Sequence, residues 1–293
     1  MRPLKLFFIT FFSLFVIQHT TAQFDGIYSQ YMNIKHFYNP AAVGEQELMK
    51  MMVAQRLDWI GIKNAPKTTL FTVNTPFSVG KTHHAAGIQF INDIFGIFAN
   101  QQINLQYAYK FQFEYGVLSV GANLGVINLI CYGDSIKMVE SDYHTPANSD
   151  PAIPIGTQTG LGFDISAGVY FSNATWFAGV SLLHLPGANI RLGDKYDFKI
   201  NRVMTAVGGY NIKLLNPDFQ LKPSLLFYTD LVSWQAQVSL LLDYQDKYNG
   251  GIAYSVQDAV SFMFGAEIID GLRLGYCFDL PASSMIRATH GSH

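Results

Sequence analysis

The residues of this chain that are best suited to chemistry are a few histidines, serines and carboxylates, and their positions argue against a catalytic site. His184 could act as a general base, and we expect it on an outward strand face with Trp176 and Leu182. A hydrolase would also need a nucleophilic serine and an orienting polar group beside that base. Ser181 and Asn173 are near in sequence but fall on the opposite face of an extended strand. The sequence therefore predicts no catalytic residue and no enzymatic activity.

Metal and disulfide chemistry are disfavoured by the same reasoning. His83 and His84 are adjacent, so in a strand they point to opposite faces, and a solvated turn is the simpler interpretation. The acidic residues of one long connection are Asp134, Glu140, Asp142 and Asp150. Their spacing matches no calcium-binding loop. Cys131 and Cys277 lie in distant strands with no disulfide spacing. We therefore predict no metal, no cofactor and no disulfide.

The elements that must position these residues are strands. Segments of about ten residues alternate apolar and polar side chains along the chain, most clearly over residues 103–114. One face there carries Ile103, Leu105, Tyr107, Tyr109, Phe111 and Phe113, and the other carries Asn104, Gln106, Lys110, Gln112 and Glu114. The length of the segments and their richness in Tyr and Phe are typical of a transmembrane β-barrel rather than a soluble sandwich.

Thirteen strands can be predicted from this alternation. They cover residues 48–58, 67–75, 84–93, 99–113, 116–130, 160–171, 175–184, 201–212, 219–228, 232–243, 248–256, 260–268 and 272–279. Short turns alternate with longer connections, of which the longest are 132–159 and 185–200. Short periplasmic turns with longer extracellular loops are the rule in bacterial outer membranes. Residues 76–83 are expected to break this rule as a longer periplasmic turn.

The start of the chain predicts export. Arg2 and Lys5 precede an apolar run over residues 6–17, and small residues up to Ala22 suit a signal peptidase. Residues 1–22 are therefore expected to be a signal peptide cleaved after Ala22. Residues 23–47 do not alternate, and we expect either a plug segment or a periplasmic leader there. Residues 48–293 are the predicted barrel domain.

Composition is consistent with a barrel in the outer membrane. Charged residues make up 14% of the chain, against about 25% in a soluble domain. The formal net charge of −2 does not point to nucleic acid. The charges predicted to face the lumen are Lys110, Glu114, Asp164, Lys222, Asp243, Glu267, Arg273 and Asp279. They could tune a channel or pair with one another across a filled interior.

Three groups of residues, taken in order along the chain, resemble a known family. They are Gln30-Tyr31-Met32-Asn33 with Asn39-Pro40-Ala41-Ala42-Val43-Gly44, then Arg56-Leu57-Asp58-Trp59 with Ala65-Pro66-Lys67-Thr68 and Thr75-Pro76, and finally Phe278-Asp279-Leu280-Pro281-Ala282-Ser283-Ser284 with Gly291-Ser292-His293. This ordered set resembles the motifs of the PorP/SprF family, outer-membrane proteins of the type IX secretion system of Bacteroidota. The motifs also suit plain structural roles, such as a turn at Asn39-Pro40 and an interface residue at Trp59.

The resemblance implies a function that composition cannot show. It implies a non-enzymatic accessory that helps deliver or retain a specific large surface protein, for example a gliding adhesin, through that client's C-terminal sorting domain. The implied partners are the client, other type IX translocon components and outer-membrane lipid. The two longest connections are the expected contact surfaces. The alternative is a passive or substrate-selective channel.

The strand count carries one more expectation. Bacterial barrels of one chain have an even number of strands, because an unpaired edge in lipid leaves backbone groups unsatisfied. Thirteen strands are present, and the resembling family continues into one more. We therefore expect a fourteen-stranded barrel whose last strand is missing from this sequence.

Overall fold

The computed structural model describes residues 26–135, 156–193 and 196–293. Antiparallel strands dominate it, forming one 14-stranded sheet and one two-stranded hairpin. The sheet contains β1 (Lys50–Leu57), β2 (Lys67–Val79), β3 (Thr82–Phe95), β4 (Phe98–Phe113), β5 (Gly116–Tyr132), β6 (Thr157–Ser172), β7 (Trp176–Leu183), β10 (Val203–Tyr210), β11 (Ile212–Lys213), β12 (Phe219–Thr229), β13 (Trp234–Tyr244), β14 (Tyr248–Ser255), β15 (Ala259–Ile269) and β16 (Leu272–Pro281). The hairpin contains β8 (Asn189–Leu192) and β9 (Tyr196–Lys199).

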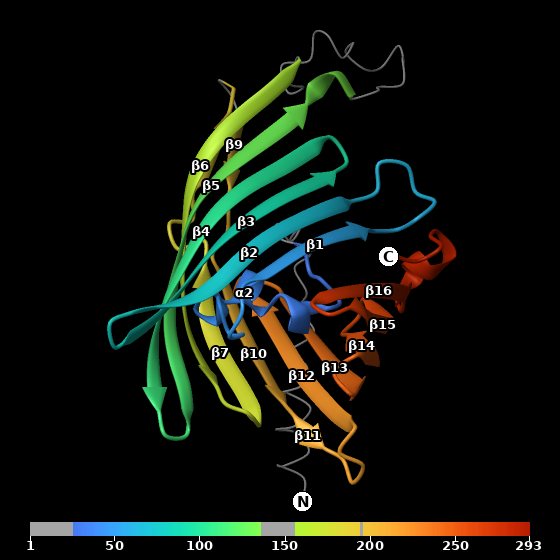
Figure 1. The fold of residues 1–293 in the computed structure, drawn as a ribbon. Helices are drawn as coiled ribbons and strands as arrows, with labels where there is room; N and C mark the ends of the chain where they lie inside the picture. Colours follow the sequence, from blue (N-terminus) through green and yellow to red (C-terminus); the bar gives the residue numbers. More distant parts are fainter. Residues whose placement is uncertain (1–25, 136–155, 194–195) are drawn as a thin grey trace, which may run out of the picture.

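The sheet has an up-and-down topology. Consecutive strands pair along the chain, except that β7 pairs with β10 because the β8–β9 hairpin is inserted between them. The short β11 pairs only with β12, so the continuous path from β1 to β16 contains thirteen strands, the number predicted. The sheet curls round until β1 and β16 approach each other (Figure 1). The predicted class, an all-β transmembrane barrel of antiparallel strands, is confirmed.

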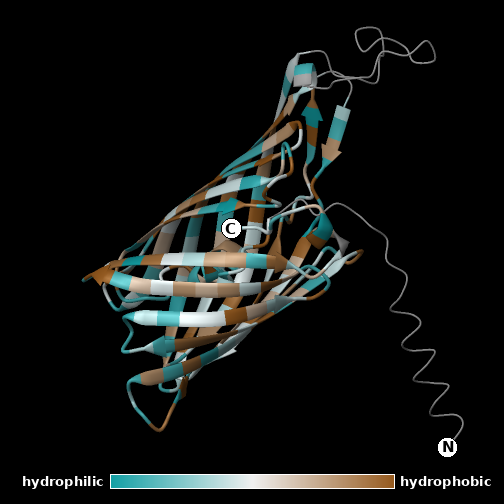
Figure 2. Cartoon of the chain, turned by 90° about the vertical axis from the view of Figure 1, so that its right-hand side faces the viewer, coloured by the Kyte–Doolittle hydropathy of each residue, from teal (hydrophilic) through white to brown (hydrophobic). Residues whose placement is uncertain are grey.

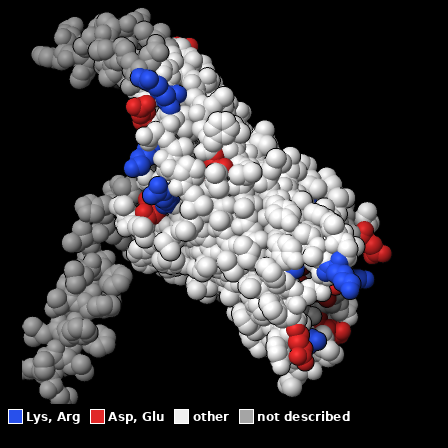
Figure 3. All heavy atoms as spheres, turned by 90° about the vertical axis from the view of Figure 1, so that its left-hand side faces the viewer, with Lys and Arg blue, Asp and Glu red and all other residues white. Residues whose placement is uncertain are grey.

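The alternation of side chains is also as predicted. On β4, Gln102, Asn104 and Gln106 are buried inside, whereas Ile103 and Leu105 are exposed on the outside. Figure 2 shows hydrophobic and hydrophilic residues alternating along the strands. On the outer face in Figure 3, charged side chains gather at the two ends and leave the middle without charge. Such an uncharged belt suits the hydrocarbon layer of a bilayer.

The turn predicted over residues 76–83 is wrong. β2 continues through Pro76 to Val79, and only Gly80 and Lys81 connect it to β3. Proline is tolerated there because β1 begins at Lys50, opposite Asn74, so Pro76 lies beyond the β1 ladder on a free edge. The exception to the rule of short turns therefore disappears.

The strands differ greatly in length. β4, β5 and β6 contain 16, 17 and 16 residues, whereas β7, β10 and β14 contain 8 each. About 9–11 tilted residues cross a membrane. Because Ser172 of β6 pairs with Phe177 of β7, these two strands are level at their short-turn end. The extra length therefore lies at the other end, called the loop end here, and we call β3–β6 the tall wall (Figure 1).

Among the described residues, no helix is long and apolar enough to cross a membrane.

Candidate functional site

Residues 26–47, called the plug here, pack against the inner face of the sheet (Figure 1). The plug contains three short helical turns, η1 (Tyr31–Asn33), α2 (Lys35–Tyr38) and η2 (Pro40–Ala42). Its most deeply buried apolar side chains are Tyr31, Ile34, Tyr38, Ala41 and Val43. The first four of these side chains join a core with Leu70 of β2, Tyr170 of β6 and Leu226 of β12, whereas Val43 packs on Ala85 and Ala108. The plug therefore bridges opposite parts of the wall.

Polar contacts fix the middle of the plug to β6, β7 and β10. The carbonyl oxygen of Tyr38 accepts hydrogen bonds from the Ser181 and Thr205 hydroxyls at 2.6 and 2.8 Å. The Asn39 amide donates to the carbonyls of Val169 and Val180 at 3.0 and 3.2 Å. Strands that are distant in sequence thus provide hydrogen-bond partners for the Tyr38 carbonyl and the Asn39 amide at the end of α2.

Asn39 has a second role at the start of η2. Its side-chain oxygen accepts the Ala41 N–H at 3.0 Å, and Pro40 follows it at the first position of the turn. The predicted turn at Asn39-Pro40 is therefore present, but the same asparagine also ties the turn to the barrel wall. An Asn cap with Pro at the first helical position suits such a turn.

The end of the plug nearest the short turns carries charge. Lys35 pairs with Glu45 at 2.6 Å, and its ammonium lies 3.9 Å from the centre of the Phe177 ring. The Tyr170 hydroxyl donates to Glu45, and Lys110 donates to the Gly44 carbonyl. The predicted lumen charge Lys110 is therefore hydrogen-bonded to the backbone of the plug.

An ionic cluster that is only partly exposed to solvent joins the plug to both edge strands. Arg56 of β1 lies 2.8 Å from the Asp58 carboxylate and 2.9 Å from that of Asp279 on β16. Ser29 of the plug accepts from Arg56 at 3.0 Å and donates to Asp279 at 2.6 Å. Two predicted motif residues, Arg56 and Asp279, are thus direct partners across the two edges of the sheet.

The gap between β1 and β16, called the seam here, is bridged at its loop end by residues 291–293. Ser292 exchanges two backbone hydrogen bonds with Asp279, and His293 exchanges two with Leu57. The Trp59 N–H donates to the Ser292 hydroxyl at 3.0 Å. Motif residues from both parts of the sequence therefore meet in one place.

Below these contacts, no described residue pairs with the facing edges of β1 and β16. Beyond the Leu57 contact, β1 continues for seven residues, 50–56, and beyond the Asp279 contact, β16 also continues for seven, 272–278. The two edges run in the same direction, and the bridge is antiparallel to both. The seam therefore has the length and polarity for one antiparallel strand.

The other motif residues have structural roles. The Asp58 N–H donates to the Pro66 carbonyl at 3.0 Å, which closes the connection that contains Ala65. Gln30 accepts from the Asn33 amide at 3.0 Å. Pro281 is the last residue of β16, and Ser283 caps the short turn η4 (Ser284–Arg287) by accepting from Met285 N–H.

Most of the predicted lumen charges have partners. Lys222 lies 3.1 Å from Asp243, and Arg273 lies 3.8 Å from Glu267. Asp164 lies 3.0 Å from His184. Glu114 instead lies exposed in the turn after β4.

The predicted outward position of His184 is wrong. Its side chain is buried inside, against Asp164, because its φ of 55° ends the regular alternation just after β7. The Ser181 hydroxyl, considered above as a nucleophile, is held by Thr205 and the Tyr38 carbonyl. Asn173 accepts backbone N–H bonds in the β6–β7 turn. The structure therefore does not bring these three residues together.

The remaining candidates are also separate. His83 contacts Ser78, whereas His84 stacks on Phe77 and contacts the Tyr107 hydroxyl. Asp134 accepts the Gly156 N–H. Glu140, Asp142 and Asp150 lie outside the described residues. Cys131 and Cys277 are both free thiols.

The connection over residues 185–200 is folded rather than open. It contains the β8–β9 hairpin, and Ile190 and Leu192 of β8, together with Ile200 just after β9, pack on Ile127 and Leu129 of β5. The hairpin therefore covers the inner face of the tall wall, and only part of this predicted contact surface remains free. The other long connection lies mostly over residues 136–155, outside the described residues.

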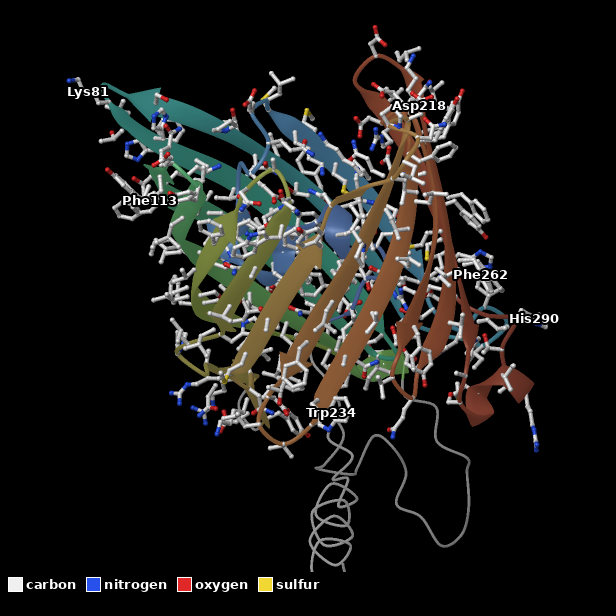
Figure 4. The ribbon with its side chains drawn as sticks, turned by 90° about the horizontal axis from the view of Figure 1, so that it is seen from below. Lys81, Phe113, Asp218, Trp234, Phe262 and His290 are labelled. Carbon is white, nitrogen blue, oxygen red and sulfur yellow. The ribbon has the colours of Figure 1, made fainter. Side chains whose placement is uncertain are left out.

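Sequence reasoning missed the anchors of the plug. Ser181, Thr205 and Ser224 are short polar residues on alternating segments, and nothing in their spacing marks them as partners of the plug. The only usable signal was the break in alternation before residue 48. Figure 4 shows the contrast with the outer face, where Phe262 projects away from the interior.

Comparison with known proteins adds the identity of the family. No curated protein matches the chain. Among solved structures, it is similar to the β-domain of the Bordetella autotransporter BrkA, with 13% identity over 79% of this chain and 92% of that one and a TM-score of 0.32. The sequence model of the type IX secretion system membrane protein PorP/SprF matches residues 20–293. The chain therefore belongs to the PorP/SprF family of type IX secretion system membrane proteins.

Proposed function

We propose that this protein is a non-enzymatic outer-membrane accessory that helps secrete, anchor or retain one large surface protein through that client's C-terminal sorting domain. Membership of the family supports a role in type IX secretion. The observation that carries the proposal is the plug, which fills the barrel between β2, β6 and β12. A filled barrel is suited to holding a partner at its loop end rather than to passing solutes.

We also propose how the chain reaches that place. Residues 1–22 act as a signal peptide cleaved after Ala22, and the loop end faces the cell exterior. The short turns on the opposite end support this orientation. Mass spectrometry of the mature N-terminus tests the cleavage, and a start at any residue other than Gln23 contradicts it.

The seam is proposed to hold one further antiparallel strand of the barrel. Unpaired N–H and C=O groups cost several kcal/mol each in hydrocarbon, and a strand that pairs with both edges removes that cost. The equal seven-residue spans on β1 and β16 support this proposal. Hydrogen exchange of β1 and β16 in the purified barrel tests it, because a strand in the seam would protect the amides on both edges.

The rival function is a passive or substrate-selective channel. The paired lumen charges and the buried plug give it less support. Planar-bilayer recordings of the purified barrel separate the two functions. The accessory predicts a closed barrel, whereas steady open conductance would favour the channel.

The main test is made in the native cell. Deletion of the gene is expected to remove one type IX cargo protein from the cell surface while the other cargo proteins stay. Quantitative proteomics of surface-labelled cells measures this loss, and re-expression of the intact chain is the control. Unchanged display of every cargo protein would sink the accessory role.

A further inference from the structure

The tall wall has a free edge at the loop end. β6 pairs with β5 along its whole length, but its pairing with β7 covers only Ala167–Ser172. β7 stops at Leu183 and the chain turns inward at His184. Among the described residues, no strand lies beside the edge of β6 over Thr157–Phe163.

The backbone groups on this edge can be assigned. The Ile165 carbonyl accepts from Leu185 N–H on the β7 side, at 2.8 Å. In an antiparallel strand, alternate residues direct both N–H and C=O to the same side. The N–H and C=O groups of Thr159, Leu161 and Phe163 therefore point toward the free edge.

The edge lacks the devices that normally block strand addition. Exposed edges are usually protected by charges, by prolines or by bulges. Residues 157–163 contain no charged residue and no proline. On their outward face, Leu161 and Phe163 are 72% and 78% exposed. At Leu161 and Phe163, backbone groups that have no partner among the described residues thus occur together with exposed apolar side chains.

The β8–β9 hairpin packs on the inner face of β6 and supports the free edge there. Gly160 and Gly162 turn toward β8, where an added Cβ would lie 2.4 Å from the Arg191 carbonyl oxygen and 2.8 Å from Ile190. Glycine is therefore required for the hairpin to lie flat on β6. An edge that is rigid before binding loses little entropy when a partner strand adds to it.

We propose that the free edge of β6 at Thr157–Phe163 binds an extended strand of the secreted client by strand addition, with apolar client side chains covering Leu161 and Phe163. This proposal rests on the proposed function and names its contact site. The client is favoured because the plug fills the interior, which leaves the loop end for recognition. An edge of seven residues also matches the length of one strand in a folded domain.

The test uses one variant that removes a hydrogen bond on the edge and one matched pair of charge variants. Leu161→Pro deletes an N–H that points to the free edge and leaves the β5 ladder intact. Leu161→Lys adds a charge to the edge, and Asn128→Lys adds one at the paired position on β5, which has no free edge. Each variant replaces the native gene, and the heat-modifiable band of the barrel on gels confirms assembly.

Surface proteomics then compares these strains with the deletion strain. We expect Leu161→Pro and Leu161→Lys to reduce display of the deletion-sensitive cargo at least tenfold, while Asn128→Lys keeps it. If the deletion removes the cargo but the edge variants display it normally, the edge proposal is overturned and the accessory function stands. If the deletion itself has no effect, the accessory function fails first.

Two further outcomes distinguish other occupants of the edge. Native mass spectrometry that shows a dimer dissociated by Leu161→Pro would assign the edge to a second copy of this chain. Normal display combined with loss of amide protection at residues 157–163 after deletion of residues 140–150 would assign it to the neighbouring loop. Either result overturns the proposal.

Discussion

Two regions of this protein expose unpaired strand edges, and they differ in the medium around them. At the seam, the outward side chains of both edge strands are apolar and exposed, as Val53 of β1 and Leu274 of β16 show, which suits a position in lipid. On the tall wall, the edge of β6 rises beyond the end of β7. The backbone groups are chemically the same in both places. In hydrocarbon an unpaired edge must be filled for the barrel to be stable, whereas in water it can remain free and serve for recognition.

The protein treats the two edges differently. The seam is bridged at one end by residues 291–293 and is joined by the Arg56 cluster. Among the described residues, the β6 edge over Thr157–Phe163 has no backbone partner on the β7 side, and the nearest contact there runs from Leu185 to Ile165. Stabilising contacts are therefore concentrated at the seam, where unpaired backbone groups in hydrocarbon would raise the free energy of the barrel.

The largest effect is expected at the ionic cluster of the seam. Asp279→Ala leaves the largely buried Arg56 guanidinium with one carboxylate fewer, which should destabilise the barrel by about 3–5 kcal/mol. Urea unfolding in phospholipid vesicles, followed by tryptophan fluorescence, measures this change. The control is Glu267→Ala, which removes a longer and more exposed pair with Arg273. Equal losses of unfolding free energy in both variants would show that the Arg56 cluster stabilises the barrel no more than the exposed Glu267–Arg273 pair does.

A charge on the outer face at the seam should cost somewhat less. Val53 is 70% exposed on β1, so Val53→Lys places an ammonium in the lipid belt at a cost of about 2–4 kcal/mol. The same unfolding experiment applies, with Val53→Leu as the control. A cost below about 1 kcal/mol would mean that this edge is not in the hydrocarbon layer.

The plug anchor is expected to contribute an intermediate amount. Asn39→Ala removes the bonds to the Val169 and Val180 carbonyls and the cap on Ala41, so plug docking should weaken by about 1–3 kcal/mol. Planar-bilayer recordings should then show brief openings that the wild type lacks. Asn33→Ala, at an exposed position on the same segment, should leave the traces unchanged.

Plug docking should also depend on pH through His36. Burial, helped by the nearby charges of Lys50 and Lys35, lowers the pKa of His36 to about 3, against about 6.5 in an unfolded chain. The undocked plug therefore binds the proton more readily, and docking is fully stable above pH 6.5 and weakens as the pH falls toward 3. At pH 5 the loss is about 2 kcal/mol. Hydrogen exchange of the plug between pH 6.5 and 5 measures it, and His36→Gln should flatten the dependence.

The smallest effect on stability is expected at the β6 edge. Leu161→Lys adds a charge in water rather than in lipid, so the free energy of unfolding should change by no more than about 0.5 kcal/mol. The unfolding experiment used for Val53→Lys provides the direct comparison. Similar losses for both substitutions would mean that the two edges share one environment.

The fold could be predicted from the sequence, because neighbouring residues of a strand face opposite sides of the sheet whatever the rest of the chain does. The alternation from Ile103 to Phe113 determined which faces are outside, and charge exclusion from lipid makes that assignment strict. The prediction was wrong at Pro76 and at His184, where the sequence cannot show whether a neighbouring strand is present or where φ becomes positive. Both errors depend on contacts between distant segments.

The candidate site was less predictable. The motif residues Arg56, Asp279 and Ser292 could be named in advance, but not that they would meet at the seam with Ser29. Their partners lie more than 200 residues away along the chain, and only closing of the sheet brings them together. The plug anchors were hidden for the same reason, since Ser181 and Thr205 look like ordinary inward polar residues.

The sequence by itself determined the class of the protein, its antiparallel strands and which side chains face lipid, because these follow from a two-residue period and the cost of charge in hydrocarbon. Only the tertiary structure decided that the N-terminal segment fills the barrel, that the β8–β9 hairpin lines the tall wall, and that the edges of β1, of β16 and of β6 at the loop end have no strand partner among the described residues. Those features depend on strand lengths and on long-range register, which arise when the sheet curls and each backbone group finds or lacks a partner.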